Sequence, residues 1–203
     1  MKTLIPILKF LFLAALLVAC AKSPQVAPLG VDDVVLAFGD SLTFGSGALP
    51  SESYPAQLQL LINRQVVNGG VPGEISADAI LRLPLLLAEV HPKLLILCHG
   101  GNDFLRKLDE KAAAANIGAM VRLARNAGVD VVLLATPKPG LLMSPPDFYA
   151  QLAKQFAIPI DDGVLKSVLR DNELKSDLIH PNARGYAQIA QAVSRLLKNT
   201  GAI

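Results

Sequence analysis

The chain is poor in the residues that would build a disulfide framework or a metal centre. Its 203 residues include two cysteines and three histidines. Two cysteines cannot cross-link a disulfide scaffold, and neither they nor the histidines have the spacing of a zinc site. No P-loop or dinucleotide fingerprint occurs, because Pro50 stands where the run Gly45-Ser46-Gly47 would need a glycine. The sequence therefore predicts a protein with no metal and no cofactor.

An excess of charge of one sign is also lacking. The chain has 19 Lys and Arg residues against 17 Asp and Glu residues, and subtracting Lys2 and Lys9 of the N-terminal segment leaves 17 of each. A balanced chain gives no argument for binding nucleic acid or an acidic membrane surface. After residue 20, no stretch has the roughly 20 apolar residues that span a bilayer. Nucleic acid is therefore not an expected partner.

Residues 1–19 are typical of a secretory signal, with a basic start followed by an apolar run. The run ends in Leu-Val-Ala followed by Cys20, which resembles the lipobox of bacterial lipoproteins. The resemblance implies cleavage before Cys20, a lipidated thiol and an acylated amino group. An ordinary signal peptide with a chance cysteine is the alternative. Ala21, rather than an acidic residue, follows the cysteine, and this favours the outer membrane by analogy with the sorting rule of Gram-negative lipoproteins.

The segment after the leader has two prolines and little periodicity. We predict that residues 20–32 are a lipidated cysteine and tether, whose part 21–30 reaches at most ~35 Å when extended. Residues 33–203 then form one domain with a full core. Cys98 is expected to be a buried, inert thiol. We expect a monomer in the bacterial cell envelope, anchored to the membrane through Cys20 and facing the periplasm or the surface.

Short apolar runs alternate with longer segments of helical periodicity. Runs that are apolar on both faces are typical of buried parallel strands, and they occur at 34–38, 65–68, 94–98, 130–135 and 157–160. Helical patterns occur at 53–63, 75–90, 109–127, 146–155 and 183–198. Pro84 predicts a kink or break in the second of these helices. The alternation predicts an α/β fold, a three-layer α/β/α sandwich with a five-stranded parallel sheet.

Ligand sites of such sheets lie beyond the carboxyl ends of the strands, and polar or glycine-rich segments stand at those places. They are 39–43 after the first strand, 68–73 after the second, 100–103 after the third, and 177–182 before the last helix. A serine hydroxyl needs a base to take its proton, and a histidine needs a partner that fixes its tautomer. Glycine-rich turns and an asparagine amide offer the N–H groups that a developing oxyanion requires. These segments together indicate serine-dependent acyl transfer.

The four segments resemble the motif blocks of the GDSL or SGNH hydrolase family: Gly-Asp-Ser-Leu at 39–42, Asn68 through Gly73, Gly-Gly-Asn-Asp at 100–103, and Asp-x-x-His at 177–180. The resemblance spans about residues 34–198 and is closest to the small bacterial thioesterase, lysophospholipase and arylesterase group. It implies the flavodoxin-like SGNH hydrolase fold and a hydrolase without cofactor.

The resemblance also implies roles for particular residues. Ser41 would be the nucleophile, His180 the base and Asp177 the acid that orients it. The Ser41 N–H, the Gly73 N–H and the Asn102 side chain would form the oxyanion hole.

Other polar residues near these segments have structural interpretations. Asp40 and Asp103 are expected to bond loop backbone rather than to act in catalysis. His91 is expected to be a capping or surface histidine. His99 is expected in a packing or backbone-bonded role, with the edge of the site as the alternative. The Leu141–Met143 segment is expected either to rim an acyl pocket or to pack within its loop.

The predicted function is hydrolysis of small-molecule aryl or acyl esters, with thioesters and lysophospholipids as further candidate substrates. Ile75, where a threonine is common in the family, and Leu178, where glycine is frequent, bear on substrate rather than mechanism. A carbohydrate O-acetylesterase of the envelope and a non-catalytic binding lipoprotein on the same fold remain alternatives. An α/β-hydrolase is disfavoured because Thr43 stands where its G-x-S-x-G motif ends in glycine.

Overall fold

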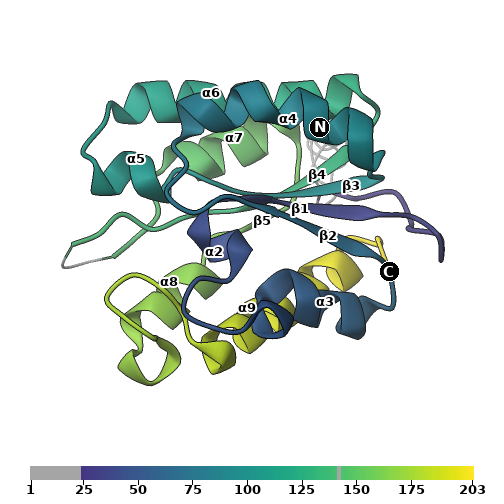
Figure 1. The fold of residues 1–203 in the computed structure, drawn as a ribbon. Coiled ribbons are helices and arrows are strands. Elements are labelled where there is room, and N and C mark those ends of the chain that lie inside the picture. The colour runs from purple at the N-terminus through teal and green to yellow at the C-terminus, as the bar shows by residue number, and fades with distance from the viewer. Residues whose placement is uncertain (1–23, 141–142) are drawn as a thin grey trace, which may run out of the picture.

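The computed structural model describes residues 24–140 and 143–203. Within them the chain forms a five-stranded, all-parallel sheet with helices on both faces (Figure 1). The strands stand in the order β2-β1-β3-β4-β5, with bounds β1 (Val35–Gly39), β2 (Val66–Gly70), β3 (Leu94–Cys98), β4 (Asp130–Leu134) and β5 (Ile160–Asp161). The predicted three-layer α/β/α sandwich is therefore confirmed.

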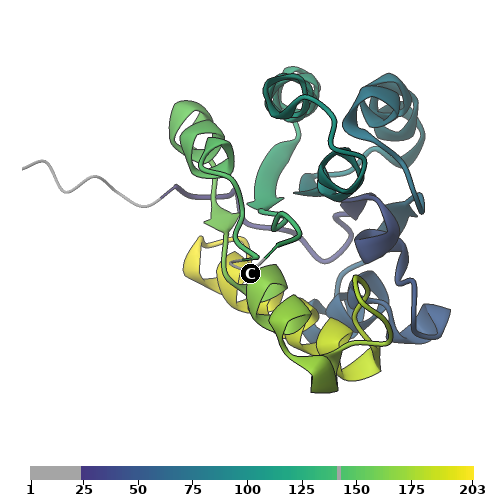
Figure 2. The same cartoon turned by 90° about the vertical axis from the view of Figure 1, so that its left-hand side faces the viewer.

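The helices divide into two layers that lie on either side of the sheet (Figures 1 and 2). One layer consists of α4 (Ser76–Val90), α6 (Glu110–Asn126) and α7 (Phe148–Phe156), and the other of α3 (Tyr54–Ile62), α8 (Val164–Arg170) and α9 (Ala183–Asn199). Short helices α2 (Ser41–Phe44) and α5 (Gly101–Leu105) follow β1 and β3, and 3-10 turns occupy Pro50–Glu52 and Asn172–Leu174.

Alternate residues of β1, β3 and β4 belong to two separate hydrophobic cores. Val35 and Ala37 pack with the α3, α8 and α9 side, whereas Leu36 and Phe38 pack with the α4, α6 and α7 side. All residues of β3 are fully buried. A strand buried on both faces is apolar throughout, which is why these runs could be read from the sequence.

The structure departs from the expected elements at β2, which runs to Gly70, at α8, which the helical patterns did not include, at the run 157–160 and at Pro84. The run 157–160 is not a four-residue strand, because Ala157 ends α7 in the left-handed conformation with φ of 49° and β5 begins only at Ile160. Pro84 does not break α4, which is continuous. This proline is exposed, so its ring lies on the solvent-facing side of the helix.

The described part of the expected tether over 20–32 is packed against the domain from residue 26 onward. The N–H groups of Val26 and Leu29 donate to the carbonyls of Thr200 and Ala202, at 3.0 and 2.8 Å. The side chains of Val26 and Leu29 are buried in the core next to α9. The folded domain therefore begins earlier in the chain than residue 33.

The expected leader 1–19 and the expected lipidation site Cys20 lie outside the described residues. Among the residues that are described, no helix combines the length and the apolar character needed to cross a membrane.

Candidate active site

Ser41 stands on the first turn of α2, directly beyond β1. The Asp40 side chain caps this helix by accepting a hydrogen bond from the Leu42 N–H at 3.0 Å. Gly39 permits the tight exit from the strand, because a Cβ at this position would lie 2.1 Å from the carbonyl oxygen of Cys98. The sharp strand-to-helix turn presents Ser41 at the carboxyl edge of the sheet.

His180 lies at that same edge, on the loop that precedes α9. The loop closes on itself, because Lys175 and Pro181 form an isolated antiparallel bridge and the Ser176 N–H donates to the carbonyl of His180 at 3.0 Å. The side chain of Asn182 caps the first turn of α9. This capping fixes where the helix begins and so fixes the position of His180.

Ser41, His180 and Asp177 form one hydrogen-bonded chain. His180 Nε2 lies 3.0 Å from Ser41 Oγ, and His180 Nδ1 lies 2.8 Å from Asp177 Oδ2. The other carboxylate oxygen of Asp177 accepts the N–H groups of Ile179 and His180, each at 2.8 Å. The structure thus brings together the three residues that the sequence motifs single out. With Nδ1 donating to the carboxylate, the lone pair of Nε2 faces the serine hydroxyl.

The electrostatics of Asp177 suit an ionised partner for the imidazole. Partial burial opposes ionisation, but hydrogen bonds from the His180 ring and from the N–H groups of Ile179 and His180 outweigh it and lower the pKa of Asp177. The carboxylate therefore keeps its charge at neutral pH and can hold the Nδ1 proton in place.

Two of the three expected oxyanion donors are available for a ligand. Within the described ranges, the N–H groups of Ser41 and Gly73 have no hydrogen-bond acceptor. Asn102 Nδ2 donates to the carbonyl oxygen of Glu74 at 3.0 Å and has a longer contact of 3.4 Å with Asp40 Oδ2. Ser41 and Asn102 line one cavity with His180, whereas Gly73 is not part of its wall.

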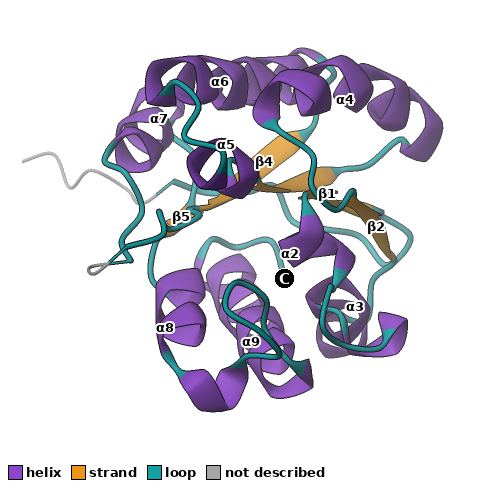
Figure 3. Cartoon of the chain, turned by 60° about the vertical axis from the view of Figure 1, so that its left-hand side comes forward, coloured by secondary structure: helices purple, strands orange, loops and turns teal. Residues whose placement is uncertain are grey.

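This cavity has a volume of about 90 Å³ and is lined by residues of α2 and α5, among others. Both helices lie at the carboxyl edge of the sheet (Figure 3). Its wall is mainly apolar, with the side chains of Leu42, Leu105, Pro137, Pro139, Met143, Leu169, Leu178 and Ile179. Of the Leu141–Met143 segment, Met143 lines the cavity, in line with the acyl-pocket alternative, and residues 141 and 142 lie outside the described residues.

The model of the GDSL-like Lipase/Acylhydrolase family matches residues 37–188, which is most of the chain. The chain belongs to this family. The predicted enzyme class, a hydrolase of carboxylic esters, is confirmed at this level.

Known proteins with similar sequences and structures cover almost the whole domain. An arylesterase from Vibrio mimicus is 30% identical over 80% of this chain and 87% of its own. The thioesterase 1/protease 1/lysophospholipase L1 of Escherichia coli (strain K12) is 27% identical over 94% of this chain and 91% of its own. A crystal structure of TesA superposes with a TM-score of 0.74 and 28% identity, over 83% of this chain and 99% of that one.

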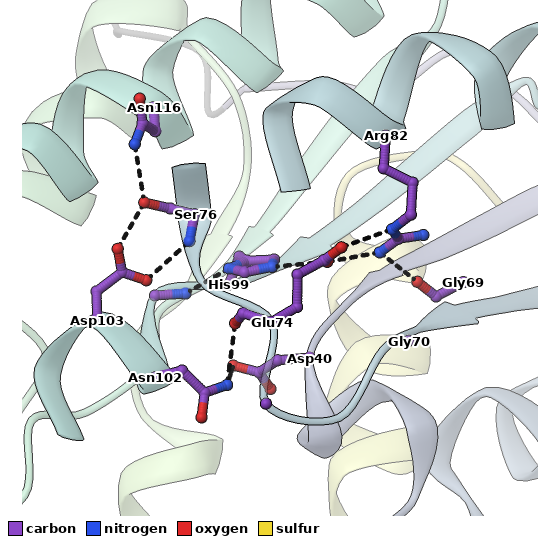
Figure 4. Close-up of polar contacts among 12 residues, drawn as sticks. Asp40, Gly69, Gly70, Glu74, Ser76, Arg82, His99, Asn102, Asp103 and Asn116 are labelled. Carbon is purple, nitrogen blue, oxygen red and sulfur yellow. Dashed lines mark hydrogen bonds and ion pairs between the residues drawn. The ribbon is translucent and has the colours of Figure 1, made fainter. Parts of the chain in front are cut away.

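The carboxylates expected to be structural in this GDSL-like hydrolase do bond backbone N–H groups, which stand in the first turns of α2 and α4 rather than in loops. Asp40 is buried and caps α2, and its burial raises its pKa above the ordinary value. Asp103 Oδ2 accepts the Ser76 N–H at 2.9 Å and its Oδ1 accepts the Ser76 hydroxyl at 2.6 Å. Asn116 donates to that hydroxyl and thereby ties α6 to the same point (Figure 4).

The remaining histidines and Cys98 also have structural positions. His91 is the C-terminal cap of α4, as expected. His99 is fully buried, bonds the backbone N–H of Gly100 and does not line the cavity. Cys98 is buried, and this burial is the main reason that its pKa is raised to about 12.

The motif reading missed two groups of residues. Thr136 and Leu169 line the cavity, yet neither stands in a family block. Thr136 follows β4 closely, so the rule on strand ends could have pointed to it. Glu74 and Arg82 form an ion pair beside the site. The signal was Arg82 itself, the one charged residue in the otherwise apolar run 79–88.

Proposed function

We propose that this chain is a serine esterase in which Ser41 is the nucleophile, His180 the general base and Asp177 the group that orients the base. The observation that supports the proposal is the continuous contact from Asp177 through the His180 ring to Ser41 Oγ, with distances of 2.8 and 3.0 Å. These are the distances over which a base can take a hydroxyl proton.

In the proposed reaction, Ser41 Oγ attacks the carbonyl carbon while its proton passes to His180 Nε2. The tetrahedral oxyanion accepts hydrogen bonds from the N–H groups of Ser41 and Gly73 and from Asn102 Nδ2. The intermediate collapses, the bond to the alcohol or thiol breaks, and the leaving group takes the proton from Nε2. Water then attacks the acyl-enzyme by the same steps and releases the acid and the free serine.

Asn102 can serve the oxyanion by giving up one long contact. Its Nδ2 carries two hydrogens, and one of them donates to the carbonyl of Glu74 at 3.0 Å. The other faces Asp40 Oδ2 at 3.4 Å, which is long for a hydrogen bond. This second hydrogen is the one assigned to the oxyanion.

The cavity favours short acyl groups. Its volume of about 90 Å³ is small beside the roughly 300–1,000 Å³ of typical ligand pockets, which favours a short acyl group. The wall is largely apolar, which suits alkyl or aryl groups better than a sugar ring. Leu178, 85% exposed, adds apolar surface at the mouth for an aromatic or alkyl leaving group. Aryl esters of short acids are therefore the proposed substrates, with thioesters hydrolysed by the same chemistry.

The test is a chain-length series of p-nitrophenyl esters, measured for the wild type and Ser41→Ala, beside acetylated xylose and a lysophospholipid. We expect kcat/KM to be highest for the shortest acyl chains and to fall by several orders of magnitude in Ser41→Ala, because that variant lacks the attacking oxygen. Near-wild-type turnover by Ser41→Ala would refute the nucleophile. A preference for acetylated xylose over the short aryl esters would instead show that the substrate is an acetylated carbohydrate.

We further propose that Cys20 carries lipid and holds the enzyme at the bacterial envelope, with Ala21 favouring the outer membrane. Five residues lie between Cys20 and Val26, where the chain packs on the domain, so the two are at most ~20 Å apart. The Ala27 N–H donates to Asp130 at the start of β4, on the edge opposite to the cavity. The anchored enzyme would therefore open its cavity away from its own membrane. Incorporation of radiolabelled palmitate into the wild type but not into Cys20→Ala tests the anchor, and its absence from both would exclude it.

A further inference from the structure

Beside the proposed active site, three side chains form a buried polar network (Figure 4). The Glu74 carboxylate accepts two hydrogen bonds from Arg82, from Nε and Nη2, each at 2.7 Å. It also contacts His99 Nε2 at 3.2 Å. The side chain of His99 is 0% exposed and that of Glu74 is 7% exposed. None of the three lines the cavity, so the network does not contact a substrate bound there.

The hydrogen bonds fix the protonation of this network. His99 Nδ1 accepts the Gly100 N–H at 2.9 Å, so the ring carries its proton on Nε2 and donates it to Glu74. Burial of Glu74 opposes its ionisation, but the hydrogen bonds from Arg82 and His99 and the charge of Arg82 outweigh it and lower the pKa of Glu74 to about 2. Glu74 is therefore an ionised carboxylate throughout the range in which an esterase works.

The network is anchored to the sheet. Arg82 Nη2 donates to the carbonyl of Gly69 in β2 at 3.1 Å. The Arg82 guanidinium lies over the Phe38 ring of β1, 4.2 Å from the ring centroid, and His99 directly follows β3. Three neighbouring strands thus hold the Glu74 side chain from different directions.

Glu74 also contacts the proposed oxyanion donors through its main chain. Its carbonyl oxygen accepts Asn102 Nδ2 at 3.0 Å, and it directly follows Gly73, whose N–H is the second donor. Gly73 has a φ of +78°, in the left-handed region, and its chain segment is exposed. Other contacts also hold this segment, since Arg106 donates to the Gly73 carbonyl at 2.7 Å and the Glu74 N–H donates to the Val71 carbonyl at 3.2 Å. Among them, the side-chain contacts of Glu74 tie the segment to the sheet.

We infer that Glu74, held by Arg82 and His99, is a positioning residue for the esterase reaction: it sets the Asn102 amide and the Gly73 N–H where the oxyanion forms. The inference rests on the proposed function of Ser41 and Asn102. An oxyanion donor acts through its placement before the reaction, so a displaced donor lowers kcat more than it raises KM.

The first test is Glu74→Gln, which keeps the size of the side chain and removes its charge. The amide oxygen of the new glutamine can accept a hydrogen bond from Arg82 or His99. Its NH2 group then faces the other of these donors, and two donors cannot form a hydrogen bond. We expect kcat for p-nitrophenyl acetate to fall about tenfold or more, with KM within about twofold of wild type. A fall in thermal stability without a fall in kcat, or a change confined to KM, would overturn the inference.

The second test is a double-mutant cycle with Asn102→Ala. If Glu74 acts mainly through Asn102, Glu74→Gln should lose most of its effect on kcat in the Asn102→Ala background. An equal factor in both backgrounds would show that Glu74 acts independently of the Asn102 donor and would overturn the inference. Ser41→Ala is measured in parallel, since its outcome decides the proposed function whatever Glu74→Gln does.

Arg82 offers a rescue experiment. Arg82→Ala leaves the Glu74 carboxylate with His99 alone, a poorly compensated negative charge beside the place where an oxyanion must form. We expect kcat of Arg82→Ala to fall further than that of Glu74→Gln, and the double variant Arg82→Ala/Glu74→Gln to recover part of the loss. No recovery in the folded double variant would contradict the charge argument. If Arg82→Ala does not fold, Glu74→Gln and its cycle decide the matter alone.

Ser76→Ala is the matched control. It removes the hydroxyl that donates to Asp103, a buried residue that directly follows Asn102 in the chain. It leaves the contacts of Glu74 and of the Asn102 amide intact. We expect Ser76→Ala to lose thermal stability with kcat within about twofold of wild type. If kcat fell as much in Ser76→Ala as in Glu74→Gln, loosening these loops at either residue would have the same effect on kcat. Glu74 would then have no specific role.

Discussion

His180 Nε2 lies 3.0 Å from Ser41 Oγ, although 139 positions separate the two residues in the chain. Ser41 owes its place to the turn from β1 into α2, and His180 owes its place to the closed loop before α9. The parallel sheet makes the meeting possible, because its carboxyl edge collects the loops that follow its strands. The contact between Ser41 and His180 supports a reaction in which both side chains take part.

Removing the charge of Asp177 should slow the reaction. Asp177→Asn keeps an oxygen for the N–H groups of Ile179 and His180, but its NH2 group can face His180 Nδ1 and favour the wrong tautomer. We expect kcat to fall by roughly two to four orders of magnitude, since such a tautomer change is costly in serine hydrolases. Steady-state kinetics with p-nitrophenyl acetate measure it. A loss of less than threefold would mean that Asp177 does not orient the base.

Removing the Asn102 amide should weaken the oxyanion site. Asn102→Ala is expected to cost about 3 kcal/mol of transition-state stabilisation, seen as a fall in kcat of about two orders of magnitude. Measuring kcat and KM separately is the check. An increase in KM with kcat unchanged would assign Asn102 to substrate binding instead.

Enlarging the cavity should shift the acyl-chain preference. Leu169 of α8 is 7% exposed and lines the cavity, so Leu169→Ala should raise the relative kcat/KM for butanoate and hexanoate esters over acetate. Leu165→Ala is the matched control, because Leu165 is buried in the same helix without lining the cavity. Both variants are expected to lose about 2–5 kcal/mol of stability. The same shift in both variants would mean that the cavity wall does not set chain length.

The Glu74 network should make stability depend on pH in acid. The folded pKa of Glu74 is about 2, below the ordinary value of 4.5, so its contribution is fully present above pH 4.5 and is lost as the pH falls toward 2. We expect wild type to exceed Glu74→Gln by roughly 2–3 kcal/mol in free energy of unfolding at pH 6, and by much less at pH 2.5. Urea denaturation at the two pH values tests this. A difference that grows as the pH falls would reverse the sign of the argument.

The strands and the proposed catalytic groups could be predicted because their signals are local. A strand buried on both faces, such as β3, is apolar at every position, and Ser41, Asp177 and His180 stand in short motif blocks. The shift of β5 could not be predicted, because nothing in the residue type of Ala157 announces its left-handed backbone.

Features that depend on distant partners were not predictable. Val26 and Leu29 stand in a proline-containing segment that resembles a tether, and only their pairing with Thr200 and Ala202 at the other end of the chain packs them into the domain. The ion pair of Glu74 and Arg82 likewise depends on how α4 faces β1 and β3.

The central claim is that Ser41 is a nucleophile activated by His180. Treating the wild type, Ser41→Ala and His180→Ala with diethyl p-nitrophenyl phosphate, followed by peptide mass spectrometry, tests it most directly. We predict one diethylphosphoryl group on Ser41 in the wild type, none in Ser41→Ala, and labelling slowed by orders of magnitude in His180→Ala, because the hydroxyl then lacks its base. Labelling at another residue, or equally fast labelling of Ser41 without His180, would contradict the account.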